Sequence, residues 1–209
     1  MHIDIFHDTV CPWCRIGKQN LKIALQDWQG SPITIQYLAF FLDPTIPAEG
    51  RDFRTHMLNK GGGRISLEQF FDGPRRAGEA VGLKFNFEAI QYAPNTLLSH
   101  QLIALAPPTL QEATIDAIYK AYFEEARNIG ELSVLVDIAA EVGLDTDQTR
   151  QQLERGEMRD KVLSEVALAH QLGVTGVPLF VFNNKFALSG AQPPHVFRQV
   201  LYQVEELAS

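Results

Sequence analysis

Two cysteines, Cys11 and Cys14, are the residues of this chain whose type and spacing most directly predict chemistry. They are the only cysteines among 209 residues, and Pro12 and Trp13 separate them. Side chains three positions apart on a helix lie about 5–6 Å apart at Cβ, so a small adjustment brings such a pair to disulfide distance. The spacing therefore predicts a dithiol that is oxidised and reduced reversibly with little movement of the backbone.

The first cysteine stands where a strand is expected to pass into a helix. Residues 2–7 alternate apolar and polar side chains, as a strand does, and residues 12–28 place apolar side chains on one broad helical face. Cys11 then occupies the N-cap, and Pro12 follows at the first helical position, where a missing N–H costs nothing. Because a helix N-terminus favours a negative charge, we expect an exposed Cys11 thiolate to attack and Cys14 to resolve the mixed disulfide.

The roles of neighbouring side chains in this helix are predicted less specifically. Trp13 adds apolar surface and no charge, so it is expected to contact substrate and to tune the reduction potential. Arg15 and Lys18 could favour a thiolate by their charge, but we expect both to be solvated surface residues.

The CxxC pattern has two alternative interpretations, a structural zinc site and a buried pair of thiols without redox activity. Two thiols supply half of a four-ligand zinc site, but the sequence lacks a second Cys/His pair at ligand spacing. His2 is expected to share a strand face with Asp4 rather than with His7. A strand directly before the pair favours redox chemistry, so we expect no metal ligands and no organic cofactor.

The order of the predicted elements indicates a mixed α/β chain. Residues 33–40 form a second strand, which completes a right-handed strand–helix–strand unit. Residues 44–170 predict an all-helical insertion, with helices over 66–80, 97–106, 110–125, 133–142 and 147–171. Ser66 and Gln69 have the spacing of a capping box. The Gly61–Gly63 run predicts a loop or hinge, because no Gly-Lys-Ser/Thr follows it as a phosphate loop requires.

The last forty residues return to mixed structure. Residues 179–182 and 185–188 are expected to form a hairpin around Asn183-Asn184, two residues that tolerate positive φ. A closing helix follows the proline pair at 193–194. Pro178 opens the first hairpin strand, a position where no ladder donor is needed.

Composition excludes several classes of protein. Lys and Arg total 18 against 25 Asp and Glu, a net charge of −7, which argues against a general nucleic-acid or anionic-membrane binder. The longest apolar runs are far shorter than the roughly 20 residues of a membrane span. Two cysteines are too few for a disulfide scaffold, and the first residues do not resemble a secretory signal. We therefore expect a cytoplasmic protein.

Six sequence stretches together resemble the DsbA-like thioredoxin-fold oxidoreductases, and more narrowly their FrnE-type members. They are DTVCPWCRIG (8–17), AFFLDP (39–44), PNTLLSH (94–100), YFEEA (122–126), GVPLFVF (176–182) and SGAQP (189–193). The resemblance implies a thioredoxin-like core of residues 1–43 and 171–209, interrupted by the helical domain of residues 44–170. It also implies that Cys11 is the nucleophile, Cys14 the resolving cysteine and Pro178 a cis-proline.

The resemblance further implies how substrates are held. A cis-proline lies against the thiol pair in such proteins, and the backbone of the preceding residue, here Val177, can pair with an extended peptide. Pro12 and Trp13 are then expected to line the same substrate surface, with the helical domain shaping a groove above it. The expected partners are protein or peptide thiols and disulfides, with glutathione as an electron partner. Pro-Trp replaces the Pro-His of periplasmic members, so their strongly oxidising character does not transfer to this chain.

Two other functions stay open at this point. Glutathione-dependent enzymes related to 2-hydroxychromene-2-carboxylate isomerase and kappa-class glutathione transferases resemble this architecture, but they generally use a serine near the helix start. Two intact cysteines here favour dithiol exchange. A chaperone-like module that binds peptides in the helical groove, with the thiols secondary, is the third possibility.

Overall fold

The structure, a computed structural model, describes residues 1–60 and 66–207. Its chain divides into two compact units, unit 1 of residues 1–42 and 165–209 and unit 2 of residues 43–164. The predicted loop at Gly61–Gly63 lies outside the described residues.

Unit 1 contains one four-stranded sheet in the order β2-β1-β5-β6. β1 and β2 are parallel, as the strand–helix–strand pattern predicted, whereas β5 pairs antiparallel with both β1 and β6. The turn between β5 and β6 places Asn183 and Asn184 at φ values of 49° and 55°. The elements are β1 (His2–His7), α1 (Pro12–Leu25), β2 (Thr34–Ala39), β5 (Leu179–Phe182), β6 (Phe186–Ser189) and α9 (Pro194–Glu206).

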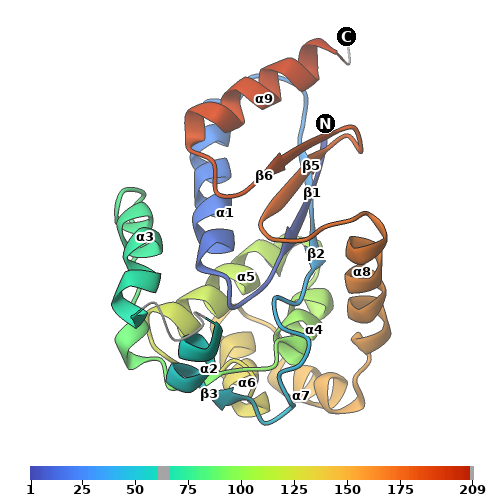
Figure 1. Cartoon of the computed structure of the whole chain (residues 1–209). Helices are drawn as coiled ribbons and strands as arrows, with labels where there is room; N and C mark the ends of the chain where they lie inside the picture. The colour runs from blue at the N-terminus through green and yellow to red at the C-terminus, as the bar shows by residue number, and fades with distance from the viewer. Residues whose placement is uncertain (61–65, 208–209) are drawn as a thin grey trace. The chain divides into compact units, whose positions relative to one another are not determined.

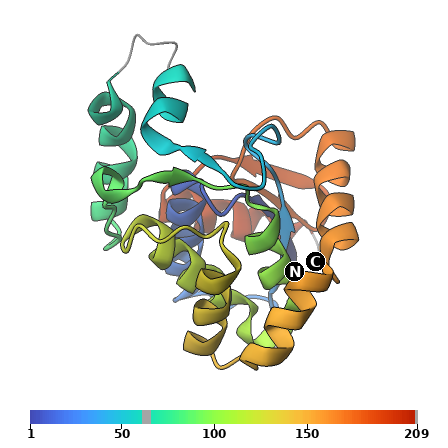
Figure 2. The same ribbon diagram turned by 90° about the horizontal axis from the view of Figure 1, so that it is seen from below.

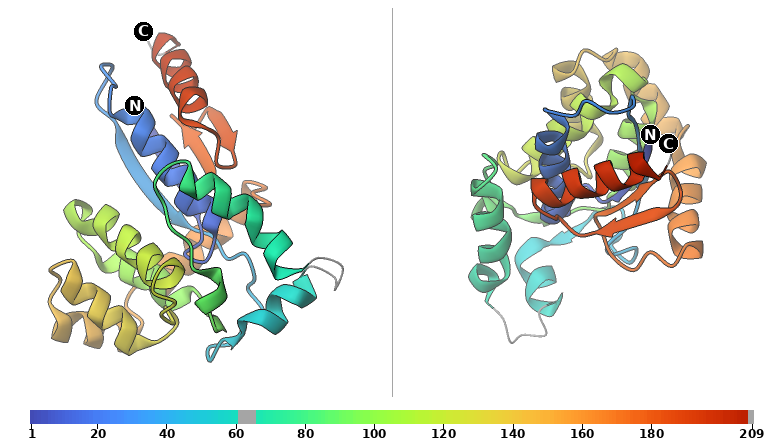
Figure 3. Two further views of the ribbon diagram at one scale, coloured as in Figure 1. Left: turned by 90° about the vertical axis from the view of Figure 1, so that its left-hand side faces the viewer. Right: turned by 90° about the horizontal axis from the view of Figure 1, so that it is seen from above.

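Helices α1 and α9 lie side by side over one face of this sheet (Figure 3). Ile3 and Ile5 of β1 are buried, and Ile5 pairs in register with Phe180 of β5. The Phe180 ring meets the ring of Phe197 from α9 edge-on, with centroids 4.7 Å apart. The strand alternation that buries these residues therefore fixes α9, and with it α1, against the sheet.

The other face of the sheet packs on the C-terminal part of α8 (Arg159–Gln171), as Figure 1 shows. Phe6, Leu38 and Phe40 form a buried cluster there with Ala169. The Glu165 carboxylate also accepts a hydrogen bond of 3.0 Å from the Ala39 N–H. Unit 1 is therefore a three-layer α/β/α arrangement, the thioredoxin-like core expected from the sequence.

Unit 2 is mainly helical. Helices α4 to α7 pack against one another as a bundle (Figure 2), and an aromatic core stacks Phe71 on Phe87 with centroids 4.1 Å apart. The expectation of an all-helical insertion was wrong in one detail, because β3 and β4 form a short antiparallel pair. The elements are β3 (Arg51–Asp52), α2 (Phe53–Lys60), α3 (Leu67–Glu79), the 3-10 helix at Phe87–Ala89, β4 (Tyr92–Ala93), α4 (Leu97–Leu105), α5 (Pro108–Phe123), α6 (Leu132–Glu141) and α7 (Thr146–Arg155).

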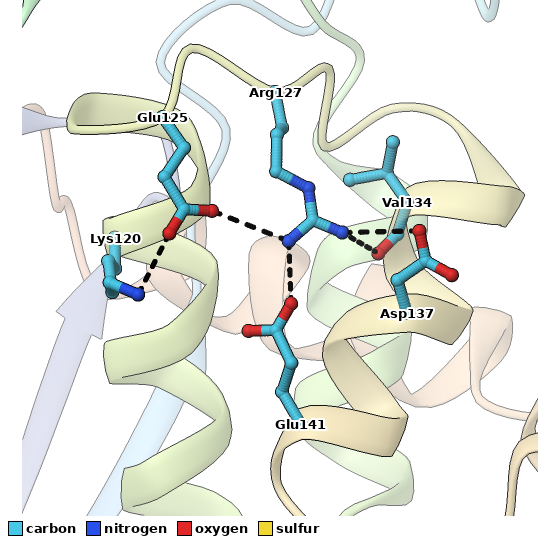
Figure 4. A network of polar contacts seen from close by, with 6 residues as sticks. All are labelled: Lys120, Glu125, Arg127, Val134, Asp137 and Glu141. Carbon is cyan, nitrogen blue, oxygen red and sulfur yellow. Dashed lines mark hydrogen bonds and ion pairs between the residues drawn. The ribbon is translucent and has the colours of Figure 1, made fainter.

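Polar contacts fix the start of α3 and the connection between α5 and α6. Ser66 caps α3 and forms both hydrogen bonds of the predicted capping box with Gln69. The segment between α5 and α6 is held by Arg127, whose guanidinium contacts the carboxylates of Glu125, Asp137 and Glu141 and the carbonyl of Val134 (Figure 4). A single cation thus ties the end of one helix to the next.

Two expectations about residues 147–171 were wrong. The single predicted helix is two, α7 and α8, because Gly156 adopts a left-handed conformation with φ 64° and ends α7. The second boundary between the units falls at residue 165 rather than 171. The reason is physical, since α8 runs continuously across the boundary and its last turns pack on the sheet of unit 1.

Replacing Gly156 by alanine should destabilise the protein by about 1 kcal/mol, because a Cβ is disfavoured at positive φ. The added Cβ would meet Arg159 and Gln101 only at ordinary contact distances of 3.7 and 3.8 Å, so the cost is in the backbone. Urea unfolding followed by circular dichroism measures it. Gly156→Asn is the matched control and should lose less, since asparagine tolerates this conformation; equal stability of Gly156→Ala and the wild type would contradict the assignment.

Candidate active site

The thiol pair sits at the start of α1, where the sequence placed it. Cys11 is the N-cap in an extended conformation (φ −93°, ψ 111°), and Pro12 is the first helical residue. Cys14 lies one turn further along, and both cysteines are free thiols. The Cys11 N–H donates a 3.1 Å hydrogen bond to the Asp8 carbonyl, which fixes the turn between β1 and α1.

The expectation that Cys11 is exposed was wrong. Cys11 is 3% exposed and Cys14 is 2% exposed, so accessibility does not distinguish them. The two residues between the cysteines are more exposed, since Trp13 is 40% exposed and Pro12 is half-buried. In the described structure the tryptophan, rather than either sulfur, is the part of the motif that solvent reaches.

Val177 lies against the Cys11 thiol, although more than 160 residues separate them in the sequence. The Cys11 S–H donates to the Val177 carbonyl oxygen, with 3.6 Å between sulfur and oxygen. The Val177–Pro178 peptide bond is cis, Val177 is half-buried and Pro178 is buried. Pro178 directly precedes β5, which pairs with β1, so the strand pairing brings this segment to the thiol.

The two thiols differ in their surroundings. Burial raises the pKa of the Cys14 thiol well above its ordinary value, and the hydrogen bond and charge of Cys11 raise it further. A hydrogen bond from the Asp8 backbone opposes this rise in pKa by favouring the thiolate. Cys14 is therefore held as a protonated thiol at neutral pH, which suits a group that reacts second.

Asp8, the first residue of the stretch DTVCPWCRIG, is a residue of the site to which no role was predicted. It is 1% exposed, and its carboxylate accepts a 2.7 Å hydrogen bond from the Leu42 N–H. Its carbonyl and its backbone N–H serve the two cysteines, as described above. Asp8 thus joins the end of β2 to the turn that carries the thiols. An aspartate three residues before the first cysteine was the available signal.

Arg15 and Lys18 are buried, at 8% and 6% exposed, so the expectation of solvated side chains was wrong. All residues from Cys14 to Lys18 are buried, and five consecutive helical positions cover more than one full turn. The turn of α1 from Cys14 to Lys18 is therefore buried all round, which buries its polar positions together with its apolar ones.

The described residues bear on two further questions, metal binding and membrane spanning. Within residues 1–60 and 66–207, no group of three or more His, Cys, Asp and Glu side chains is arranged to hold a metal ion. His2 instead contacts Asp4 on its own strand, at 2.8 Å. In the same part of the chain, no helix combines the length and apolar character needed to cross a membrane.

Comparison with known proteins identifies the family. Residues 2–202 match the DSBA-like thioredoxin domain. The chain belongs to this DsbA-like family. A probable DsbA oxidoreductase from Streptomyces coelicolor is 32% identical, with a TM-score of 0.88 over 98% of this chain and 89% of that one. The Bacillus subtilis (strain 168) protein YwbO, itself uncharacterized, is 25% identical over 205 residues, which is 96% of each chain.

More distant solved structures share the fold alone. The cytosolic disulfide reductase DsbM from Pseudomonas aeruginosa is 19% identical with a TM-score of 0.69, over 99% of this chain and 100% of that one. It has also been solved with glutathione. A 2-hydroxychromene-2-carboxylate isomerase is 15% identical with a TM-score of 0.72, over 98% of this chain and 96% of that one. The fold is therefore common to reductases and isomerases, and the side chains at the start of α1 must decide between them.

The raised pKa of Cys14 gives a direct prediction for a Cys11→Ser variant. Burial remains the largest cause in that variant, so Cys14 should titrate above the ordinary cysteine value of about 8.5 and react slowly with iodoacetamide at pH 7. The alkylation rate as a function of pH, followed by mass spectrometry, measures the midpoint. The same variant unfolded in urea is the control, and a folded midpoint at or below the unfolded one would contradict the assignment.

Proposed function

We propose that this chain is a thiol–disulfide oxidoreductase that exchanges disulfides with protein or peptide substrates through Cys11 and Cys14. The observation that carries the proposal is the position of the Cys11 sulfur, at a helix N-terminus and 3.6 Å from the Val177 carbonyl. Cys11 is assigned as the nucleophile, because the helix start favours its thiolate form, and Cys14 as the resolving cysteine.

The proposed reaction transfers two electrons from the dithiol to a substrate disulfide. The Cys11 thiolate attacks one substrate sulfur, forms a mixed disulfide and expels the other substrate sulfur as a thiolate, which takes up a proton. Cys14 then loses its proton and attacks the Cys11 sulfur. The Cys11–Cys14 disulfide forms as the second substrate thiolate leaves and is protonated. The reverse sequence oxidises a substrate dithiol.

Surfaces for a peptide substrate adjoin the thiols in this proposal. Among the described residues the Val177 N–H makes no hydrogen bond, so it is available to an extended substrate backbone. Trp13 and Pro12 supply exposed apolar surface beside the sulfur, and Pro178 holds Val177 in place. We assign these four residues to substrate binding.

We also propose that the protein is of the FrnE type and works in the cytoplasm, with glutathione as an electron partner. The Pro-Trp dipeptide between the cysteines supports this assignment. The fold likeness to a cytosolic disulfide reductase that has been solved with glutathione is compatible with it. No resident organic cofactor enters the proposed reaction.

Substitution of each cysteine separates the two roles. Cys11→Ser should lower the rate of disulfide reduction with dithiothreitol by at least about 10³-fold, because the attacking sulfur is gone. Cys14→Ser should instead accumulate a mixed disulfide between Cys11 and the substrate, which non-reducing electrophoresis and mass spectrometry detect. Both variants should keep the circular dichroism spectrum of the wild type.

Three results would contradict this function. Full reductase activity in Cys11→Ser would exclude Cys11 as the nucleophile. Glutathione-dependent isomerisation or conjugation that survives Cys14→Ser would favour the isomerase and transferase alternative. Protection of unfolded clients by a Cys11→Ser/Cys14→Ser double variant, without any redox activity in the wild type, would favour the chaperone-like alternative.

A further inference from the structure

One face of α1 connects the thiol pair to the segment that contacts it. Cys14, Gly17 and Asn20 are spaced three residues apart, so they lie along the same side of the helix, and all three are buried. The first carries the resolving thiol. Gly17 and Asn20 take no direct part in the proposed reaction. Gly17 lies next to Pro178, and Asn20 is hydrogen-bonded to the loop that binds Pro178.

Gly17 allows an unusually close approach of α1 to Pro178. A Cβ built at position 17 would lie 3.0 Å from the Pro178 Cγ and 3.1 Å from the Cζ of Phe180. Neither neighbour is the far end of a flexible side chain, since one belongs to a proline ring and the other to a fully buried aromatic ring. Any larger residue at position 17 would therefore push α1 and the Pro178 segment apart by a few tenths of an ångström.

Asn20 connects α1 to the loop that follows β6. Its side-chain amide, 4% exposed, donates hydrogen bonds to the carbonyls of Gln192 at 2.9 Å and Ala191 at 3.5 Å. The Gly190 N–H in turn donates a 2.9 Å hydrogen bond to the Pro178 carbonyl. The loop after β6 is thus bonded both to α1 and to Pro178.

The Asn20 amide oxygen is buried and has no hydrogen-bond partner among the described residues. An unpaired buried acceptor is unfavourable, so the contacts that hold this side chain are those of its N–H groups.

We propose that Gly17 and Asn20 are positioning residues that set the distance between the Cys11 sulfur and the Val177–Pro178 backbone. Cys11 and Gly17 belong to the same rigid helix, so the gap at Gly17 determines how closely the sulfur approaches the Val177 carbonyl. A peptide substrate that pairs with Val177 would receive its position from this gap, whereas a small disulfide would not. The inference rests on the proposed function and adds a determinant of preference for peptide substrates.

The test compares two substrates in the Gly17→Ala variant. Reduction of a disulfide-bonded peptide should lose about ten-fold or more in kcat/KM, because small misplacements of reacting groups are costly. Reduction of hydroxyethyl disulfide, which is too small to pair with Val177, should change less than about two-fold on the same reasoning. The ratio of the two values is the readout, because a loss of folded protein would lower both equally. Asn20→Leu, which removes the two N–H donors, should shift the ratio in the same direction, and it carries the test if Gly17→Ala does not fold.

Gly78→Ala is the matched control, because its Cβ would lie 2.3 Å from the Phe85 ring in unit 2. It should reduce stability and leave the substrate ratio unchanged. An unchanged ratio in Gly17→Ala or Asn20→Leu would overturn the positioning role while the wild-type activity stands. Absence of any cysteine-dependent reductase activity in the wild type would instead overturn the proposed function itself.

Discussion

The place of the Cys11 sulfur beside the Val177 carbonyl depends on strand pairing between distant parts of the chain. β1 delivers Cys11 to the start of α1, and β5, paired antiparallel with β1, carries Pro178 to the same edge. The registers Ile3 with Phe182 and Ile5 with Phe180 are fixed because these four side chains must share one buried face. A slip of one residue would turn them outward and would also separate the thiol from the proline.

The two sulfurs of the site have different surroundings although both are buried. Cys14 is enclosed among buried helix residues, and burial raises the pKa of its thiol. Cys11 stands at the N-terminus of α1, and its S–H donates to the Val177 carbonyl oxygen. In the proposed reaction, the helix N-terminus assigns attack to Cys11 and burial assigns resolution to Cys14.

Much of this architecture could be predicted from the sequence, because its signals are local. The alternation at 2–7, the proline after Cys11 and the two asparagines at 183–184 each specify conformation within a few residues. Long-range packing could not be predicted in this way. The burial of Cys11, Arg15 and Lys18 depends on what covers α1, and the close approach at Gly17 depends on a segment that lies far away in the chain. The break at Gly156 depends on its left-handed backbone conformation, which the spacing of apolar residues does not reveal.

A redox titration of the wild-type protein in glutathione buffers, with thiols counted by mass spectrometry, shows directly whether Cys11 and Cys14 are a redox pair. We expect one reversible two-electron transition between a dithiol and a Cys11–Cys14 disulfide. A pair that stays reduced at every glutathione ratio, or a stable glutathione adduct on Cys11 with no internal disulfide, would contradict it.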